Sequence, residues 1–148
     1  MGERLIRKME IADVDQVMEV EKATFATPWP PDIFYQELLD NKHAFYFVME
    51  LDGKIIGYIG AWIVVDDMQI TNVAVIPAYR GQKFGEMLFS YILQFAITLG
   101  VARLSLEVRK SNRIAQKMYR KFGLVPGGIR EKYYADDQED AIVMWVNL

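Results

Sequence analysis

The sequence contains no cysteine among its 148 residues. That absence excludes disulfides, thiolate metal ligands and an acyl-cysteine intermediate. Histidine is nearly absent too, because His43 is the only one. It precedes a predicted strand and has no nucleophile motif nearby, which disfavours a Ser-His-Asp hydrolase. A single imidazole without thiolates does not favour zinc either, so the sequence predicts no metal site.

An excess of positive charge is also missing. Lys and Arg number 17 against 20 Asp and Glu, which gives a net charge of -3 and a pI of about 5.2. General nucleic-acid binders are normally basic, so we expect no direct nucleic-acid partner. No window approaches the roughly 20 apolar residues of a membrane span, and no apolar signal segment begins the chain. We therefore expect a cytoplasmic protein without a membrane partner.

What the chain does contain is enough apolar material for a packed core. Hydrophobic residues make up 52% and aromatic residues 13% of the sequence, which favours a globular protein over disorder. The length fits one domain spanning residues 1–148. We find no internal repeat, linker or low-complexity segment that would divide it.

One segment near the middle of the chain predicts a strand, a glycine-bearing loop and a helix. Residues 69–75 are rich in β-branched types, and Pro77 ends the strand because it has no N–H to donate. Residues 78–84 form a polar loop that contains Gly81. Backbone N–H groups and a helix N-terminus at such a loop attract an anion, most often a phosphate, and Arg80 adds a positive charge. The spacing alone leaves a plain strand-to-helix turn as an equal alternative, and it matches neither a Walker A nor a Rossmann motif.

The rest of the pattern alternates strands and helices. We predict strands at 4–9, 44–51, 54–65, 69–75, 103–109, 124–129 and 141–147, and helices at 11–25, 32–39, 86–99 and 112–122. Asp13 is a candidate N-cap of the first helix and Ser111 or Asn112 of the last. Gly57 and Gly60 inside a strand suggest a bulge or a close approach. The result is an α+β fold with a mixed, mostly antiparallel sheet of about seven strands and helices on both faces; only the strands joined through helix 86–99 are parallel.

Strand 103–109 carries a carboxylate at its centre. Its odd-numbered residues, which include Glu107, share the face opposite its leucines. Burying an unpaired carboxylate in a sheet covered on both faces is costly. Glu107 is therefore either in a salt bridge, with Arg109 or Arg103 as partner, or open to a cavity where it can act in chemistry. Spacing alone leaves these two interpretations equal.

Several motifs resemble the GNAT N-acetyltransferases. Residues 80–85, Arg-Gly-Gln-Lys-Phe-Gly, are similar to that family's pyrophosphate loop, Arg/Gln-x-x-Gly-x-Gly/Ala, with Lys83 where the middle glycine is usual. Residues 106–112, Leu-Glu-Val-Arg-Lys-Ser-Asn, resemble the signature of the ribosomal-protein-alanine (RimI-like) branch. Phe25 with Pro28-Trp29, and Tyr133-Tyr134 with Glu139-Asp140-Ala141, resemble that branch as well. The resemblance covers nearly the whole chain and implies a GNAT-like fold.

The resemblance implies acetyl-CoA as cosubstrate. The backbone of the strand would hold the pantetheine arm, the loop would cradle the pyrophosphate, and the start of the last helix would add a contact. The implied cofactor-binding residues are Val73, Ala74, Val75, Arg80, Gly81, Gln82, Lys83, Phe84, Gly85, Glu86 and Asn112.

The resemblance also implies Glu107 as general base and Tyr119 as general acid toward the CoA thiolate. The acceptor would be a protein's N-terminal α-amine, with a small-subunit ribosomal protein that begins with alanine as the type case. An α-amine has a pKa near 8, so a carboxylate is a sufficient base, and a phenol can protonate a leaving thiolate. Tyr119, close to Met118 and Phe122, is alternatively a simple core residue.

Other interpretations stay open. Trp29, Tyr133 and Tyr134 are either packing residues or substrate contacts, and the acidic stretch 136–140 is either a solvated loop or an attractor of a basic substrate tail. The acceptor is alternatively a lysine side chain, a polyamine or another small amine. A non-catalytic acyl-CoA-binding module is a further alternative, although Glu107 and Tyr119 together argue against it. The sequence predicts no oligomeric state.

Overall fold

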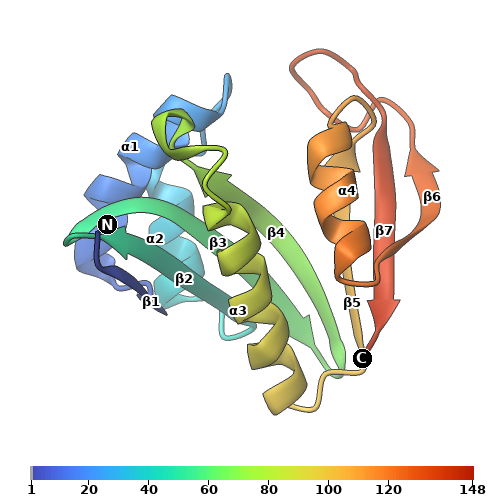
Figure 1. Cartoon of the computed structure of the whole chain (residues 1–148), viewed down its shortest axis with the longest axis horizontal. Helices are drawn as coiled ribbons and strands as arrows, with labels where there is room; N and C mark the ends of the chain where they lie inside the picture. Colours follow the sequence, from blue (N-terminus) through green and yellow to red (C-terminus); the bar gives the residue numbers. More distant parts are fainter. Residues whose placement is uncertain (1) are drawn as a thin grey trace.

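A seven-stranded sheet in the order β1-β2-β3-β4-β5-β7-β6 forms the centre of the protein (Figure 1). The computed structural model describes residues 2–148. The strands are β1 Arg4–Lys8, β2 Ala44–Leu51, β3 Lys54–Val64, β4 Asp67–Val75, β5 Arg103–Arg109, β6 Val125–Arg130 and β7 Ala141–Asn147. The helices are α1 Val14–Thr24, α2 Pro31–Leu39, α3 Phe84–Thr98 and α4 Arg113–Lys121, with short 3-10 turns at Ile11–Asp13 and Pro77–Tyr79. All neighbouring strands are antiparallel except β4 and β5, which confirms the predicted α+β sheet.

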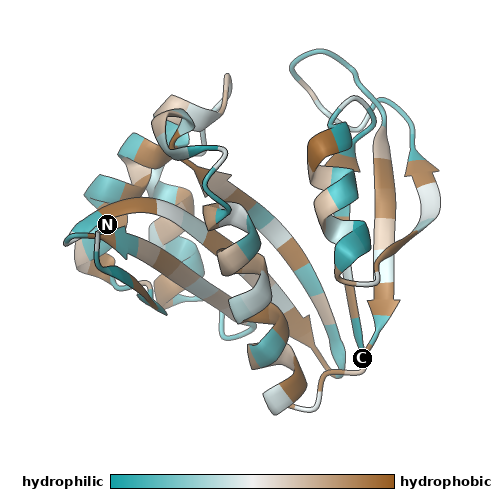
Figure 2. Cartoon of the chain, in the orientation of Figure 1, coloured by the Kyte–Doolittle hydropathy of each residue, from teal (hydrophilic) through white to brown (hydrophobic). Residues whose placement is uncertain are grey.

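The sheet separates two hydrophobic cores. Alternate residues of β2 point to opposite sides, as a period of two requires. Phe47 and Met49 pack with α3 and α4, whereas Tyr46 and Val48 pack with α1 and α2. In Figure 2 hydrophobic and hydrophilic residues alternate along β4 in the same way. The predicted helices on both faces are therefore confirmed. No helix among residues 2–148 is long and apolar enough to cross a membrane.

Glycines in β3 allow two unusually close contacts. A Cβ on Gly60 would lie 2.2 Å from the ring of Tyr46, and one on Gly57 would lie 2.7 Å from the carbonyl oxygen of Ala74. The β3–β4 register shifts between Gly60 and the next residue, where β4 carries Thr71 as an extra residue. The structure thus confirms both the bulge and the close approach that glycine in this strand suggested.

We expect Gly60→Ala to lower the free energy of unfolding by about 3 kcal/mol, because overfilling a packed core costs about 1–3 kcal/mol. Tyr46 has little room to move, since its ring is 2% exposed and its hydroxyl donates to Glu37. Urea unfolding of the variant measures the change. Gly85→Ala is the matched control, because its Cβ would approach no atom closer than 4.0 Å. Equal stability of the two variants would contradict the close contact.

Asp13 occupies the N-cap position of α1, as predicted, but its side chain forms no capping hydrogen bond to that helix. Its carboxylate accepts hydrogen bonds from Nη1 and Nη2 of Arg7, both at 2.8 Å, and from the backbone N–H of Glu10 at 2.7 Å. Arg7 also donates to Glu50 of β2. The Arg7 guanidinium holds the pKa of Asp13 below its usual value. Asp13 therefore attaches the start of α1 to β1.

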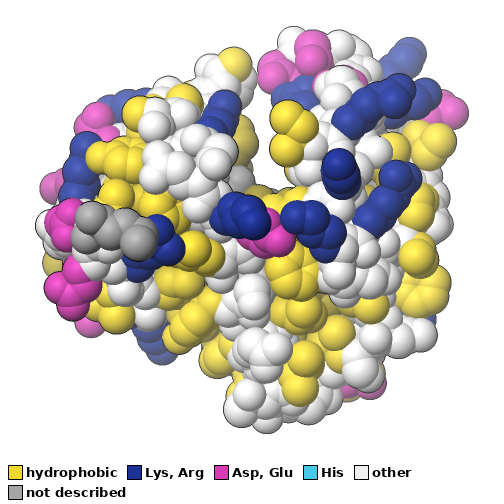
Figure 3. Space-filling model, viewed as in Figure 1, with side chains coloured by type: hydrophobic (Ala, Val, Ile, Leu, Met, Phe, Trp, Pro, Cys, Tyr) yellow, Lys and Arg dark blue, Asp and Glu magenta, His cyan; other side chains and the backbone are white. Residues whose placement is uncertain are grey.

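The parallel pair β4 and β5 separates after a short contact. Only Asp67–Gln69 of β4 pairs with residues 103–105 of β5. Beyond Gln69 the two strands diverge (Figure 1), and Figure 3 shows the molecular surface hollowed between the two halves. Within the described part of the chain, residues 2–148, the β5-facing edge of residues 70–75 therefore has no strand partner, which leaves its backbone groups available to a ligand.

Candidate active site

Glu107 lies on β5 where the two strands begin to separate. Its side chain is 9% exposed, and Nε of Arg130 on β6 donates to its Oε1 at 3.0 Å. Nε2 of Gln69, the last β4 residue paired with β5, lies 3.3 Å from Oε1 and 3.1 Å from Oε2. Among residues 2–148, Oε2 thus accepts a hydrogen bond only from Gln69, and it keeps capacity to accept a proton.

Neither salt-bridge partner expected from spacing binds Glu107. The guanidinium of Arg103 lies over the ring of Trp145 at 5.0 Å, and that of Arg109 binds the acidic loop. Both arginines share a sheet face with Glu107, but neighbouring strands bring Gln69 and Arg130 closer. Glu107 is therefore in a salt bridge, but its partner is Arg130 and not Arg103 or Arg109. Glu107 also lies where β4 and β5 diverge.

Tyr119 on α4 is 5% exposed, and its ring packs 5.1 Å from that of Phe89 on α3. Burial raises the pKa of Tyr119 well above 10, and Tyr134 contributes to the shift. The hydroxyl is therefore protonated at neutral pH and able to donate. Within residues 2–148 it forms no hydrogen bond, so the core role of the ring and a donor role of the hydroxyl are compatible.

The loop before α3 presents backbone N–H groups to solvent. Gly81 has φ +80°, and Lys83 has φ +66° with no side-chain hydrogen bond capping the helix. The left-handed conformation costs an ordinary residue roughly 1–2 kcal/mol, which explains why glycine is usual where Lys83 stands. Lys83 nevertheless adopts that geometry. The first N–H groups of α3, at Phe84–Glu86, have no intrahelical acceptor and fit a phosphate.

Asn112 begins α4, as predicted. Its Oδ1 accepts a hydrogen bond from the N–H of Ala115 at 3.1 Å, which caps the helix. At the other end of α4, Nζ of Lys121 lies 3.3 Å from Oε1 of Glu86. This ion pair joins α4 to the first turn of α3, so the two helices beside the separated strands are connected by charge.

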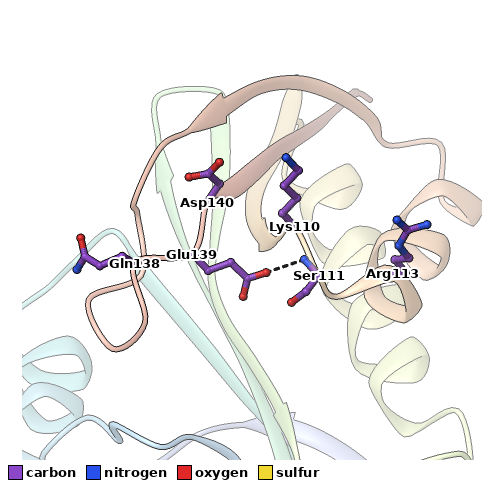
Figure 4. Close-up of a pocket in the computed structure, with 6 residues that line it drawn as sticks. All are labelled: Lys110, Ser111, Arg113, Gln138, Glu139 and Asp140. Atoms are coloured by element: carbon purple, nitrogen blue, oxygen red, sulfur yellow. Dashed lines mark hydrogen bonds between the residues drawn. The ribbon is translucent and has the colours of Figure 1, made fainter.

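An open, polar pocket of about 570 Å³ adjoins Asn112 (Figure 4). Lys110, Ser111 and Arg113 line it on the β5–α4 side. Gln138, Glu139 and Asp140 of the β6–β7 connection line the other. The N–H of Ser111 donates to Oε2 of Glu139 at 2.7 Å, which holds the two connections together.

The acidic stretch between β6 and β7 is not simply solvated. Asp136, Asp137 and Glu139 all accept hydrogen bonds from the guanidinium of Arg109, at 2.9–3.1 Å. The same guanidinium lies 4.0 Å from the centre of the Tyr134 ring. Burial raises the pKa of Tyr134 to about 12. The expected solvated loop is confirmed at Asp136 and Asp137, which are exposed, but Arg109 also fixes this loop at the end of β5.

Trp29 lies between α1 and α2 and is held by a buried acid. Its backbone N–H donates to Oε2 of Glu21 at 2.8 Å, and its ring packs 5.5 Å from that of Phe34. Glu21 is 1% exposed and also accepts a hydrogen bond from the hydroxyl of Tyr58. Burial raises the pKa of Glu21 above its usual value. A packing role of Trp29 is evident, and a substrate contact stays a prediction.

Sequence reasoning missed three residues that hold candidate site residues: Gln69 and Arg130 at Glu107, and Glu21 at Trp29. For Glu21 there was a signal, because it continues the apolar spacing of Val14, Val17 and Met18 and so had to face the core. No sequence signal pointed to Gln69 or Arg130, since they lie 38 and 23 residues from Glu107 in the chain.

The chain is similar in sequence to a known protein family and to named enzymes. Residues 14–124 match the model of the acetyltransferase (GNAT) family. A Bacillus subtilis (strain 168) protein, provisionally named ribosomal protein bS18-alanine N-acetyltransferase, is 52% identical over 97% of this chain and 95% of its own. The Escherichia coli (strain K12) enzyme of that name is 31% identical over 94% of both chains.

Solved structures agree with the sequence relatives. The crystal structure of the E. coli ribosomal-protein-S18-alanine N-acetyltransferase has a TM-score of 0.91 at 30% identity, covering 98% of this chain and 94% of that one. PaiA N-acetyltransferase from Thermoplasma acidophilum, in complex with coenzyme A, shares the fold at 17% identity and a TM-score of 0.75, with 99% of each chain covered. The chain therefore belongs to the acetyltransferase (GNAT) family and is an N-acetyltransferase.

Proposed function

We propose that the protein transfers the acetyl group of acetyl-CoA to the N-terminal α-amine of ribosomal protein bS18, beginning with alanine, in the cytoplasm. The names and the identities of the B. subtilis and E. coli relatives support this acceptor. The observation that carries the chemistry is Glu107. Its carboxylate is held by Gln69 and Arg130 at the divergence of β4 and β5, and Oε2 is open to a further donor.

Two groups of backbone atoms and the residue Asn112 would hold acetyl-CoA. The unpaired edge at Val73–Val75 suits the amides of a pantetheine arm, which pair as a strand would. The N–H groups from Gly81 to Glu86, with the guanidinium of Arg80, suit the pyrophosphate. Asn112 at the start of α4 would add a further contact, although its Oδ1 is used by the helix cap.

Glu107 and Tyr119 would handle the two protons of the reaction. Glu107 removes a proton, directly or through water, from the amine as its nitrogen bonds to the acetyl carbon. Tyr119 donates its hydroxyl proton to the sulfur as the carbon–sulfur bond breaks. An α-amine with a pKa near 8 is partly neutral at pH 7, so an ordinary carboxylate suffices as base.

Two aromatic groups would contact the acceptor. Trp29 lies in the α1–α2 connection, where Glu21 holds its backbone. Tyr133 and Tyr134 lie in the β6–β7 connection, with ring centroids 5.1 Å apart, and Arg109 fixes the second of them. Because both connections are held by charged groups, they offer fixed walls to an incoming N-terminus.

The test is thiol release from acetyl-CoA with three acceptors: an alanine-starting peptide, the same peptide with a blocked N-terminus and a free lysine, and spermidine. We expect turnover with the free N-terminus alone. Turnover with lysine or spermidine instead would contradict the proposed N-terminal acceptor, but the protein would still be an N-acetyltransferase. Coenzyme A binding without turnover of any acceptor would favour a binding module.

A further inference from the structure

A second groove lies beside Glu107, on the sheet face opposite α3 and α4. It has a volume of about 440 Å³ and is formed by residues of β3 to β7. We call it the tryptophan groove and define it by Trp62, Gln69, Arg103, Ser105, Gly127 and Trp145. Figure 1 shows α1 and α2 over the β1–β3 part of the sheet, whereas α4 covers β5 and β7 only from the other side. The groove therefore occupies sheet surface that none of the helices described for residues 2–148 covers.

One wall of the groove is an indole held by a buried carboxylate. Trp62 is 40% exposed, and its Nε1 donates to Oε1 of Glu37 at 2.6 Å. Glu37 is 8% exposed and also accepts from the hydroxyl of Tyr46 at 2.8 Å and from Nδ2 of Asn41 at 2.7 Å. The polar edge of the indole is thus satisfied, and its orientation is set by three donors converging on one acid.

The opposite wall is Trp145 on β7. The guanidinium of Arg103 lies 5.0 Å from its ring centroid on one side. A Cβ at Gly127 would come within 2.4 Å of Cδ1 and Nε1 of the indole, at the edge of the ring, so only glycine lets the ring lie there. Both tryptophans therefore have positions fixed before any ligand arrives, which lowers the entropic cost of binding.

The floor of the groove connects to Glu107. One row of residues crosses four strands, because each member is paired in register with the next. The row consists of Trp62, Gln69, Ser105 and Trp145. Gln69 contacts both oxygens of Glu107, one row further along β5. Four residues of β5 separate Glu107 from Arg103, or about 13 Å at the rise of a strand. That distance matches about four residues of an extended peptide.

We propose that the tryptophan groove binds the residues that follow the acceptor amine, with an aromatic or apolar side chain of the peptide between Trp62 and Trp145. The inference rests on the proposed function, since it places the acceptor amine at Glu107. The amide of Gln69 and the hydroxyl of Ser105 suit a peptide backbone, and the two indoles suit a planar or apolar side chain.

The experiment compares two acceptors. One is an alanine-starting hexapeptide with phenylalanine at its third position. The other is alanyl-glycine amide, which has no third residue to place between Trp62 and Trp145. We expect Trp62→Ala to lower kcat/KM about tenfold for the hexapeptide, a loss of the size that aromatic pairs contribute. For alanyl-glycine amide, kcat/KM should stay within twofold. Ile97→Ala is the matched control, because Ile97 is 50% exposed on α3, on the other face of the sheet.

Four outcomes would overturn the groove as a peptide site. An equal loss with both acceptors would indicate a general structural role of Trp62. Unchanged kcat/KM with the hexapeptide would place the peptide elsewhere. A change in sedimentation of the variant with unchanged kinetics would assign the groove to a second copy of the chain. Absence of turnover of either acceptor by the wild type would overturn the proposed function, and the groove with it.

Discussion

Glu107→Gln is expected to lower kcat/KM for an alanine-starting peptide by about 10²–10⁴-fold, the usual contribution of a general base. Glutamine keeps the shape of the side chain and an oxygen that Arg130 can still donate to, so the fold should be retained. What it loses is the capacity to take a proton from the amine. Thiol release from acetyl-CoA, followed at a series of pH values, measures the effect.

The pH series separates a base from a binding residue. The deficit of Glu107→Gln should persist as the pH rises above about 8, because the proton that Glu107 removes leaves the nitrogen only as the nitrogen bonds to the acetyl carbon. A deficit that disappears above about pH 8 would instead indicate that Glu107 only binds the protonated amine, which is scarce at that pH. Glu131→Gln is the matched control, an identical chemical change at an exposed residue. Undiminished turnover by Glu107→Gln would overturn the base assignment.

Tyr119→Phe is expected to lower kcat by about 10²-fold or more, because the leaving thiolate loses its proton donor. The ring contact with Phe89 is retained, and the hydroxyl has no partner in residues 2–148, so the free energy of unfolding should change little. Steady-state kinetics and urea unfolding of the same variant separate the two quantities. Burial raises the pKa of Tyr119, so the hydroxyl stays protonated up to at least pH 10 and causes no alkaline loss of activity below that pH.

Tyr91→Phe is the matched control for Tyr119→Phe. Tyr91 lies on the same helix as Phe89, is 38% exposed and packs its ring 5.1 Å from that of Phe47. If both variants keep wild-type kcat, Tyr119 is only a core residue and another group must protonate the thiolate. Tyr134 would then be the next residue to test, since it lies close enough to Tyr119 to influence its pKa.

The local elements of this fold were readable from the sequence because their signals are local. Pro77 ends β4, Asn112 caps α4, and the glycines of β3 mark a strand that approaches Tyr46 and Ala74 closely. Each depends on backbone geometry or on a contact within one element and its neighbours. The carboxylate of Glu107 was also conspicuous, since a charge at the centre of a strand requires an explanation.

The partners of those residues were not readable. Glu107 was expected to pair with an arginine on its own strand, but register and twist bring Gln69 of β4 and Arg130 of β6 to it. Asp13 was expected to cap α1 and does occupy the N-cap position, but its carboxylate binds Arg7 of β1 instead of the helix. Both outcomes depend on which side chains of separate elements meet, and short-range sequence patterns carry no information about that.

The sequence by itself determined the strands and helices, and it predicts an anion-binding loop before α3 and a chemical role for the carboxylate of Glu107. Only the tertiary structure showed that β4 and β5 separate after Gln69, that Arg109 gathers the acidic loop, and that Trp62 and Trp145 face one groove. The physical reason is distance along the chain. Hydrogen bonds within a helix or turn follow from a few adjacent residues, whereas a cleft and a groove arise from how seven strands are paired and twisted.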